Sequence, residues 1–106
     1  MTNARIEQLS QFLKEDPNDP FIKYALAIEY LNIDKQISQQ MFDGLLENHP
    51  DYIATYYHAA DLYNELELRE RAEEIYQKGI AKAEALKEHH ALKELKSAYL
   101  NFQFEE

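Results

Sequence analysis

The chain has 106 residues, which is the usual size of one domain and is enough for one modest hydrophobic core. It contains no cysteine, so disulfide bonds and thiolate metal sites are excluded, and no apolar run approaches the roughly 20 residues that a membrane helix needs. The net charge of −9 disfavours nucleic acid and anionic membrane surfaces as ligands, because both are bound mainly through Lys and Arg.

Apolar residues recur at steps of three and four along most of the chain, which predicts helices. A first stripe lies within residues 1–16 and stops at the segment 16–20. Asp19 is a suitable N-cap for a second helix over residues 20–33, with Pro20 at its first position. Asp34 can cap a third helix, which ends at residues 48–50. The apolar residues that we expect in these stripes are Ile6, Leu9, Phe12 and Leu13, then Ile22, Leu26, Ala27, Tyr30 and Ile33, then Ile37, Met41, Phe42, Leu45 and Leu46.

The second half of the chain continues the helical pattern. Asp51 opens a fourth helix over about residues 52–65, and a fifth helix begins near Leu68 and Arg69. No Gly or Pro follows Ile80, so the end of the fifth helix carries no strong signal. The apolar stripe changes phase near residues 87–90, and we therefore expect a break there, followed by a sixth helix. Short links between helices predict antiparallel neighbours.

Two segments of the chain repeat each other at an offset of 33 or 34 residues. The matched pairs are Leu26 with Ala59, Ala27 with Ala60, Tyr30 with Tyr63, Ser38 with Ala72, and Phe42 with Tyr76. Pro17 and Pro50 are also 33 residues apart. A period of this length that contains two helices is typical of stacked helical hairpins.

The repeat resembles that of the tetratricopeptide repeat family, whose motif is Trp-x2-Leu-Gly-x2-Tyr, then Ala-x3-Phe, then Pro, over 34 residues. Lys23 stands where the first repeat should have Trp, and Glu84 stands where the second should have Pro. The other motif positions are filled by Leu26, Ala27, Tyr30, Ser38, Phe42 and Pro50, and by Tyr56, Ala59, Ala60, Tyr63, Ala72 and Tyr76. The resemblance implies an all-α fold, a short right-handed α-solenoid of antiparallel helical hairpins with about six helices.

We expect one domain over residues 1–106. Residues 1–16 would form the helix of an incomplete repeat, 19–50 the first full repeat, 51–86 the second, and 87–106 a capping helix. A helical hairpin of this kind cannot bury its apolar face alone, so the half repeat and the cap would complete the stack.

The predicted helix over 20–33 is apolar on nearly all sides, so it is either buried all round or exposes a surface that binds. In the family that the chain resembles, the first helix of each hairpin lines a concave face that binds a peptide or protein segment. The resemblance therefore implies a site on the second and fourth helices. The predicted contact residues are Phe21, Tyr24, Ile28, Tyr57, Asp61 and Asn64.

Several alternatives stay open at this point. The stripe with Phe21, Tyr24 and Ile28 can instead be covered by neighbouring helices or by the C-terminal segment. Residues 99–104 are apolar on more than one face, so they either dock on the fifth helix or join a second copy of the chain. The excess of acidic groups either attracts a basic partner or only keeps the protein soluble. The basic clamp with which several family members hold a C-terminal carboxylate is absent, so we predict no such binding.

No group of residues indicates an enzyme, a cofactor or a metal. His89 and His90 point about 100° apart on a helix, and His90 with Glu94 supplies two ligands where zinc needs three or four. His58 has no base or nucleophile at a catalytic spacing. The N-terminal sequence lacks the pattern of a secretory signal, and together with the absence of cysteine this favours a cytoplasmic protein.

Overall fold

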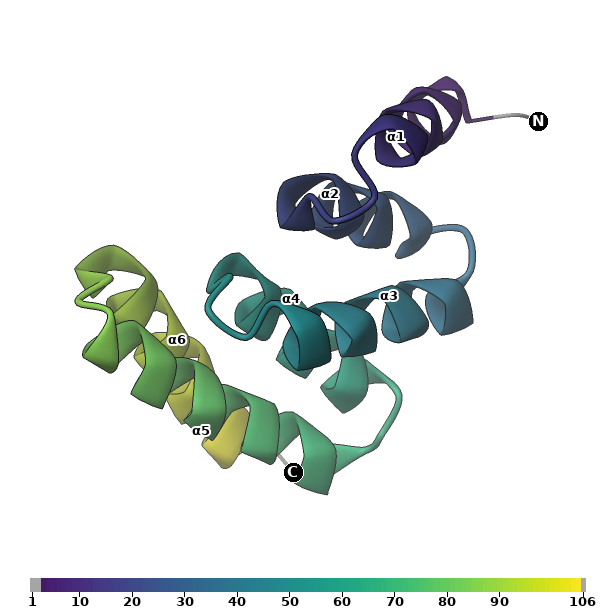
Figure 1. Ribbon diagram of the computed structural model, residues 1–106. Helices are drawn as coiled ribbons and strands as arrows, with labels where there is room; N and C mark the ends of the chain where they lie inside the picture. The colour runs from purple at the N-terminus through teal and green to yellow at the C-terminus, as the bar shows by residue number, and fades with distance from the viewer. Residues whose placement is uncertain (1–2, 106) are drawn as a thin grey trace. The chain divides into compact units, whose positions relative to one another are not determined.

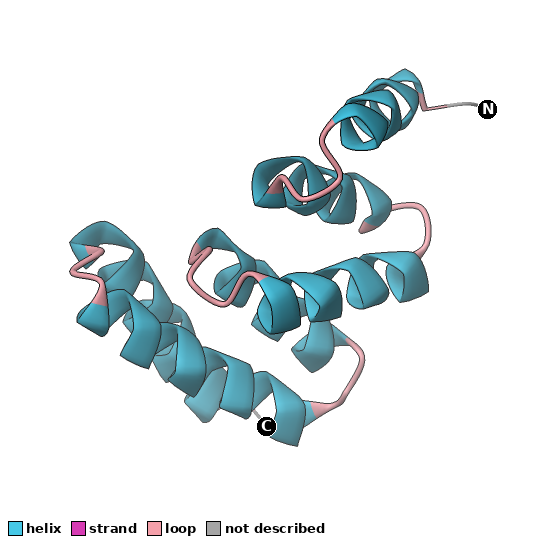
Figure 2. Cartoon of the chain, in the orientation of Figure 1, coloured by secondary structure: helices cyan, strands magenta, loops and turns pink. Residues whose placement is uncertain are grey.

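The computed structural model describes residues 3–105, and this part of the chain is all-α, as predicted (Figure 1). Short loops join its helices, and no strand occurs among the described residues (Figure 2). Within that range there are six helices: α1 (Ala4–Glu15), α2 (Pro20–Tyr30), α3 (Lys35–Asn48), α4 (Ala54–Glu65), α5 (Arg69–Ala85) and α6 (His89–Phe104).

The helices form two compact units, an N-terminal unit (Met1–Tyr52) and a C-terminal unit (Ile53–Glu106). In the N-terminal unit α2 packs against both α1 and α3, and consecutive helices are antiparallel. In the C-terminal unit α5 packs against α4 and α6, and α6 also contacts α4. The expected organisation as one domain with a half repeat, two repeats and a cap is not decided by this division and stays a prediction.

The first three helices begin with side-chain caps. Asn3, Asp19 and Asp34 each accept a hydrogen bond from backbone N–H groups in the first turn of α1, α2 and α3. The predicted capping roles of Asp19 and Asp34 are therefore confirmed. Asp51 does not cap α4, because that helix begins only at Ala54 and has no side-chain cap.

The end of α4 is set by a left-handed residue that is not glycine. Glu67 has a φ of 62°, and its N–H donates to the carbonyl of Asn64 at 3.0 Å. The N–H of Leu68 then donates to the carbonyl of Tyr63 at 2.9 Å. These two bonds are those of a Schellman motif, which satisfies the last carbonyls of a helix and turns the chain out of it.

The end of α5 repeats this turn with different residues. Lys87 has a φ of 59° and donates to the carbonyl of Glu84 at 3.2 Å, while Glu88 donates to the carbonyl of Ala83 at 2.9 Å. The break expected near residues 87–90 is thus confirmed, since α5 ends at Ala85 and α6 begins at His89.

Two residues that were expected in the core of the N-terminal unit are exposed. Leu9 and Leu26 are buried as predicted, but Phe12 is 45% exposed and Ile33 is 57% exposed. Phe12 lies about 100° around α1 from Leu13, at the edge of the stripe that faces α2. Ile33 is exposed because α2 ends at Tyr30, so this residue lies in the following turn and not on the helical stripe.

In the C-terminal unit, α4 and α5 approach each other at Tyr56 and Gly79. A Cβ atom at Gly79 would lie 2.6 Å from Cβ of Tyr56, closer than any two such atoms can pack. The equivalent positions of the first repeat hold Lys23 and Leu45, so there the larger apolar residue is on the second helix of the hairpin. The departure from the family motif at Lys23 thus coincides with a larger residue, Leu45, at the position equivalent to Gly79.

Candidate protein-binding surfaces

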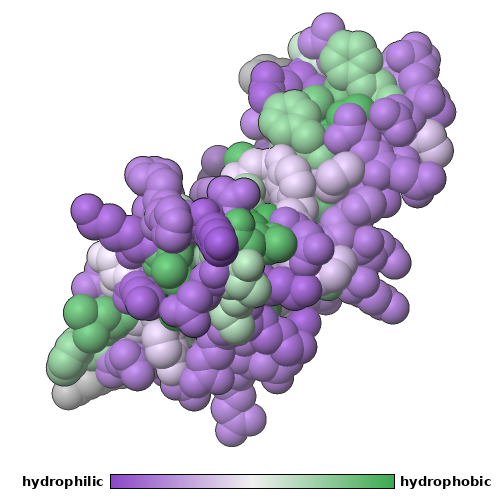
Figure 3. All heavy atoms as spheres, turned by 60° about the vertical axis from the view of Figure 1, so that its left-hand side comes forward, coloured by the Kyte–Doolittle hydropathy of each residue, from purple (hydrophilic) through white to green (hydrophobic). Residues whose placement is uncertain are grey.

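The three predicted contact residues of α2 follow one side of that helix. Phe21 is 58% exposed, and Tyr24 and Ile28 are half-buried. In the space-filling view, apolar side chains stand among hydrophilic ones at the top of the molecule, over the N-terminal helices (Figure 3). The structure thus leaves part of the apolar stripe of α2 accessible.

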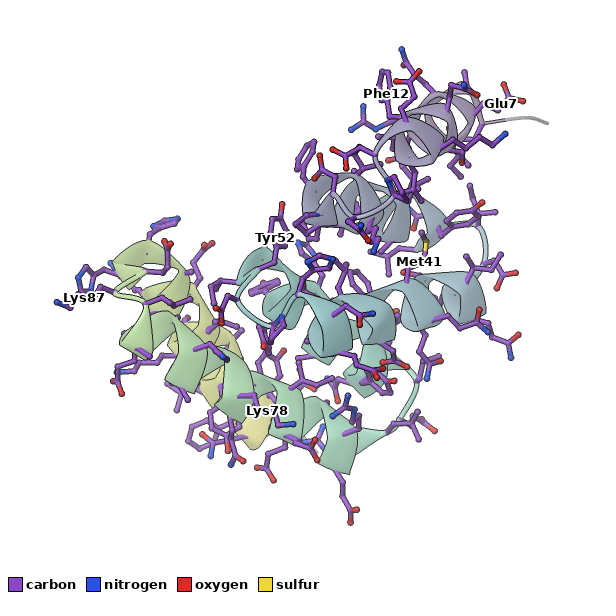
Figure 4. The ribbon with its side chains drawn as sticks, viewed as in Figure 1. Glu7, Phe12, Met41, Tyr52, Lys78 and Lys87 are labelled. Atoms are coloured by element: carbon purple, nitrogen blue, oxygen red, sulfur yellow. The ribbon has the colours of Figure 1, made fainter. Side chains whose placement is uncertain are left out.

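Tyr24 lies against a second tyrosine of the same unit. Its ring centroid is 5.7 Å from that of Tyr52, and the two rings are tilted by 57°. Tyr52 follows α3 and is labelled in Figure 4. Burial, and then the charge of Tyr52, raise the pKa of Tyr24. Burial, and then the negative charge of Asp19, raise the pKa of Tyr52. Both hydroxyl groups therefore stay protonated at neutral pH.

A shallow hollow lies beside Tyr52, at the end of the N-terminal unit where α2 begins and α3 ends. Its volume is about 400 Å³. The residues that line it are Pro20, Asn48, His49, Pro50, Asp51 and Tyr52. Two proline rings and a tyrosine ring therefore form a wall that has carboxylate and imidazole groups beside it.

The predicted contact residues of α4 lie next to α6. Tyr57 is 42% exposed, and its ring meets that of His58 edge-on with the centroids 5.3 Å apart. Burial lowers the pKa of His58, and the carboxylates of Asp61 and Glu94 oppose this shift. Tyr57 also lines a hollow of about 350 Å³ with six residues of α6: His90, Lys93, Glu94, Ser97, Ala98 and Asn101.

Asn64 is engaged within the chain. Its side-chain amide donates to a carboxylate oxygen of Glu105 at 2.7 Å, and its amide oxygen accepts a hydrogen bond from Arg69 at 2.9 Å. The guanidinium of Arg69 is also 3.6 Å from the same oxygen of Glu105. The segment after α6 therefore covers the position on α4 that was predicted to contact a partner.

The apolar run at residues 99–104 docks on α5 through one of its faces. Phe102 is 4% exposed, with its ring centroid 5.4 Å from that of Tyr76. The hydroxyl of Tyr99 accepts a hydrogen bond from Gln77 at 2.9 Å and donates to Glu73 at 3.0 Å. The opposite face is open, since Leu100 is 54% exposed and Phe104 is 80% exposed.

Phe12 is an exposed aromatic residue that the sequence analysis did not include among the contact residues. It projects outward from α1 (Figure 4). The sequence pattern placed Phe12 in the apolar stripe with Ile6, Leu9 and Leu13, so it gave no signal that this ring is accessible.

The described residues 3–105 contain neither a candidate metal site nor a helix that could cross a membrane. No three His, Asp or Glu side chains in this range come together in a way that could hold a metal ion. His90 and Glu94 lie 3.2 Å apart, but they supply only two of the three or four ligands that a zinc site needs. Among the helices in the same range, none has the length and apolar character needed to cross a membrane.

Two solved structures resemble this chain over most of its length. One is the crystal structure of a tetratricopeptide repeat domain protein from Salinibacter ruber, with 38% sequence identity and a TM-score of 0.78, and the match covers 84% of this chain and all of that one. The chain belongs to the tetratricopeptide repeat family. A solution structure of a tetratricopeptide repeat domain protein from the same organism gives 39% identity, a TM-score of 0.81, and coverage of 86% and 93%. No family model and no curated protein matches the sequence.

In this tetratricopeptide repeat protein, the hairpins are α2 with α3 and α4 with α5. The resemblance predicted from the two repeats is therefore confirmed. All six predicted contact residues lie on the first helices of these hairpins, three on α2 and three on α4.

Proposed function

We propose that this tetratricopeptide repeat protein is a non-catalytic interaction module that binds a peptide or protein segment through the first helices of its hairpins. The family generally mediates protein–protein interactions. The observation that supports the proposal most directly is that each first helix presents an exposed aromatic ring, with Phe21 58% and Tyr57 42% exposed. Aromatic residues are enriched among the residues that dominate binding at protein interfaces.

The proposed contacts are Phe21, Tyr24 and Ile28 on α2, and Tyr57 and Asp61 on α4. The aromatic rings would supply most of the apolar contact area to a partner. Asn64 differs from the others, because a partner would have to displace Glu105 to reach its amide.

Selection from a random peptide library, followed by affinity measurements on variants, tests this function. Tyr24→Ala and Tyr57→Ala should each weaken the selected peptides by about tenfold, as expected for the loss of an aromatic anchor. Phe104→Ala is the matched control, because it also removes an exposed ring but lies at the end of α6. Circular dichroism shows whether each variant is folded. If folded Tyr24→Ala and Tyr57→Ala bind as the wild type does, these faces are not the contact surface.

Self-association through α6 is a second candidate function. Leu100 and Phe104 are four residues apart on one side of the helix, and both are more than half exposed. A second copy of the chain could cover this pair. Light scattering after gel filtration should then give a dimer or larger species that Leu100→Ser with Phe104→Ser converts to monomer. A wild-type chain that remains monomeric at high concentration contradicts this candidate.

A further inference from the structure

One end of the N-terminal unit combines exposed rings with negative charge. The loop 16–19 joins α1 to α2, so the last turn of α1 and the first turn of α2 lie at the same end of the unit. Residues 48–52 reach this end too, because they line one hollow together with Pro20. We call this region the acidic aromatic end. It comprises the rings of Phe12, Phe21, Tyr24 and Tyr52 and the carboxylates of Glu15, Asp16, Asp19 and Asp51.

The apolar part of this end is unusually accessible. The side chains of Phe12 and Phe21 are 45% and 58% exposed. Burying the exposed part of these rings against a partner would contribute favourable free energy of binding. Tyr24 and Tyr52 continue the aromatic surface towards the hollow, with their ring centroids 5.7 Å apart. Aromatic rings and prolines are thus gathered at one end of this unit.

The electrostatic field at this end is negative. Glu15 and Asp16 are exposed at the end of α1, and Asp51 is exposed beside the hollow. Burial raises the pKa of the Tyr52 phenol, and the negative charge of Asp19 adds to this shift. The basic residues within 12–24 and 48–52 are Lys14, Lys23 and His49. The four negative carboxylates therefore outnumber the two positive lysines.

We propose that the acidic aromatic end docks a basic segment of a partner protein, in which an apolar side chain packs on Phe12 and Phe21 and flanking Lys or Arg residues face the carboxylates. Apolar area supplies affinity in such a contact, while charge complementarity supplies partner selection and fast association. The inference rests on the proposed function, since Phe21 and Tyr24 belong to the α2 face. It goes further by stating the chemistry of the partner and by including Phe12 and residues 48–52.

Titration of the isotope-labelled chain with defined peptides, followed by NMR, tests this inference. The probe is acetyl-Gly-Arg-Leu-Arg-Gly-Arg-Leu-Arg-Gly-amide. One comparison peptide has Glu in place of every Arg, and a second has Ser in place of every Leu. The basic apolar peptide should shift the amide signals of residues 12–24 and 48–52, and each comparison peptide should bind about tenfold more weakly.

Paired variants separate the apolar from the electrostatic contribution. Phe12→Ser with Phe21→Ser should weaken the probe by about tenfold, whereas Leu100→Ser should not. Glu15→Gln with Asp16→Asn should weaken it by about threefold at low salt and by less at high salt, because exposed charges are screened. Glu70→Gln with Glu84→Gln removes two exposed carboxylates from α5 and is the control for net charge.

Two results would overturn the inference. The first is that the acidic or the serine peptide binds as well as the basic apolar peptide. The second is that the shifts lie outside residues 12–24 and 48–52, or that no shifts occur. The proposed function can survive either result, because library peptides that depend on Tyr57 would still show binding through α4. Conversely, a library selection that yields no binders contradicts the proposed function. The NMR titration then tests separately whether the acidic aromatic end binds a basic segment.

Discussion

Arg69 donates a hydrogen bond to the backbone carbonyl of Phe102 at 3.0 Å, while its guanidinium carbon lies 4.1 Å from the centroid of the ring of the same residue. Arg69 is the first residue of α5, and Phe102 lies in the last turn of α6. One side chain therefore satisfies a terminal carbonyl of α6, stacks on its buried ring and holds Asn64 in place. The arrangement fixes the end of α6 to the start of α5.

Replacing Arg69 should loosen the end of α6. Arg69→Ala removes the carbonyl hydrogen bond and the contact with the ring, and we expect it to lower the free energy of unfolding by about 1–2 kcal/mol. Arg69→Lys should recover only part of this, because an ammonium group lacks the planar fork of a guanidinium. Urea unfolding gives the stability, and hydrogen exchange should show faster exchange at residues 99–104. Lys78→Ala is the control, since its ion pair with Glu74 at 3.5 Å is solvent-exposed. Unchanged exchange in Arg69→Ala would show that the other contacts of α6 with α5 are sufficient to hold its end.

The two glycines should respond in opposite ways to alanine. Gly79→Ala places a methyl group 2.6 Å from Cβ of Tyr56, and we expect a loss of about 1–3 kcal/mol from overpacking. Gly44 has nothing within 4 Å of the same position, so Gly44→Ala should stabilise α3 by about 0.5–1 kcal/mol through its better helix propensity. Thermal or urea unfolding measures both changes. Equal effects at the two positions would contradict the close approach of α4 and α5.

Glycine should be favourable at the two left-handed positions. Glu67 and Lys87 have φ values of 62° and 59°, a conformation that disfavours residues with a Cβ atom. Glu67→Gly and Lys87→Gly should therefore each raise the free energy of unfolding by about 0.5–1 kcal/mol. Glu84→Gly, three residues before Lys87 but within α5, should lower it by about 1 kcal/mol. A loss of stability in all three variants would mean that the turns are not left-handed in solution.

His58 should make the fold less stable in mild acid. Its pKa in the folded state is lowered by burial, so the unfolded chain, with a pKa near 6.5, takes up a proton first as the pH falls. The free energy of unfolding should therefore decrease as the pH falls below about 6.5, and this part of the decrease should be absent in His58→Gln. Because Asp61 and Glu94 oppose the shift, Asp61→Asn should lower the pKa of His58 further in an NMR titration. A higher pKa in that variant would contradict the proximity of the two groups.

The helices and their pairing could be predicted because the signals are local and repeat. Asp19 and Asp34 mark helix starts, and the spacing of Leu26, Ala27 and Tyr30 occurs a second time at Ala59, Ala60 and Tyr63. The prediction that Phe12 and Ile33 are buried was wrong. Phe12 lies at the edge of the buried side of α1, and Ile33 lies beyond the end of α2 at Tyr30. The turns at Glu67 and Lys87 carry no glycine, so their type has no residue signature.

The candidate site could be predicted only as positions on helices. Which of those positions are accessible depends on contacts between residues far apart in the sequence. Asn64 and Glu105 are 41 residues apart, and nothing in the pattern of α4 indicates that its amide is bound by the segment after α6. The acidic aromatic end is likewise assembled from the ends of three helices, whose meeting depends on the fold.

The contrast between Tyr56 with Gly79 and Lys23 with Leu45 also bears on how a chain with repeats avoids mispairing. If α3 paired with α4, Leu45 would occupy the place in which Gly79 makes room for the ring of Tyr56. If α5 paired with α2, Gly79 would leave an empty space beside the flexible side chain of Lys23. The tight fit of Tyr56 against Gly79 would therefore be lost if the second helices of the two hairpins were exchanged, during folding or between neighbouring chains.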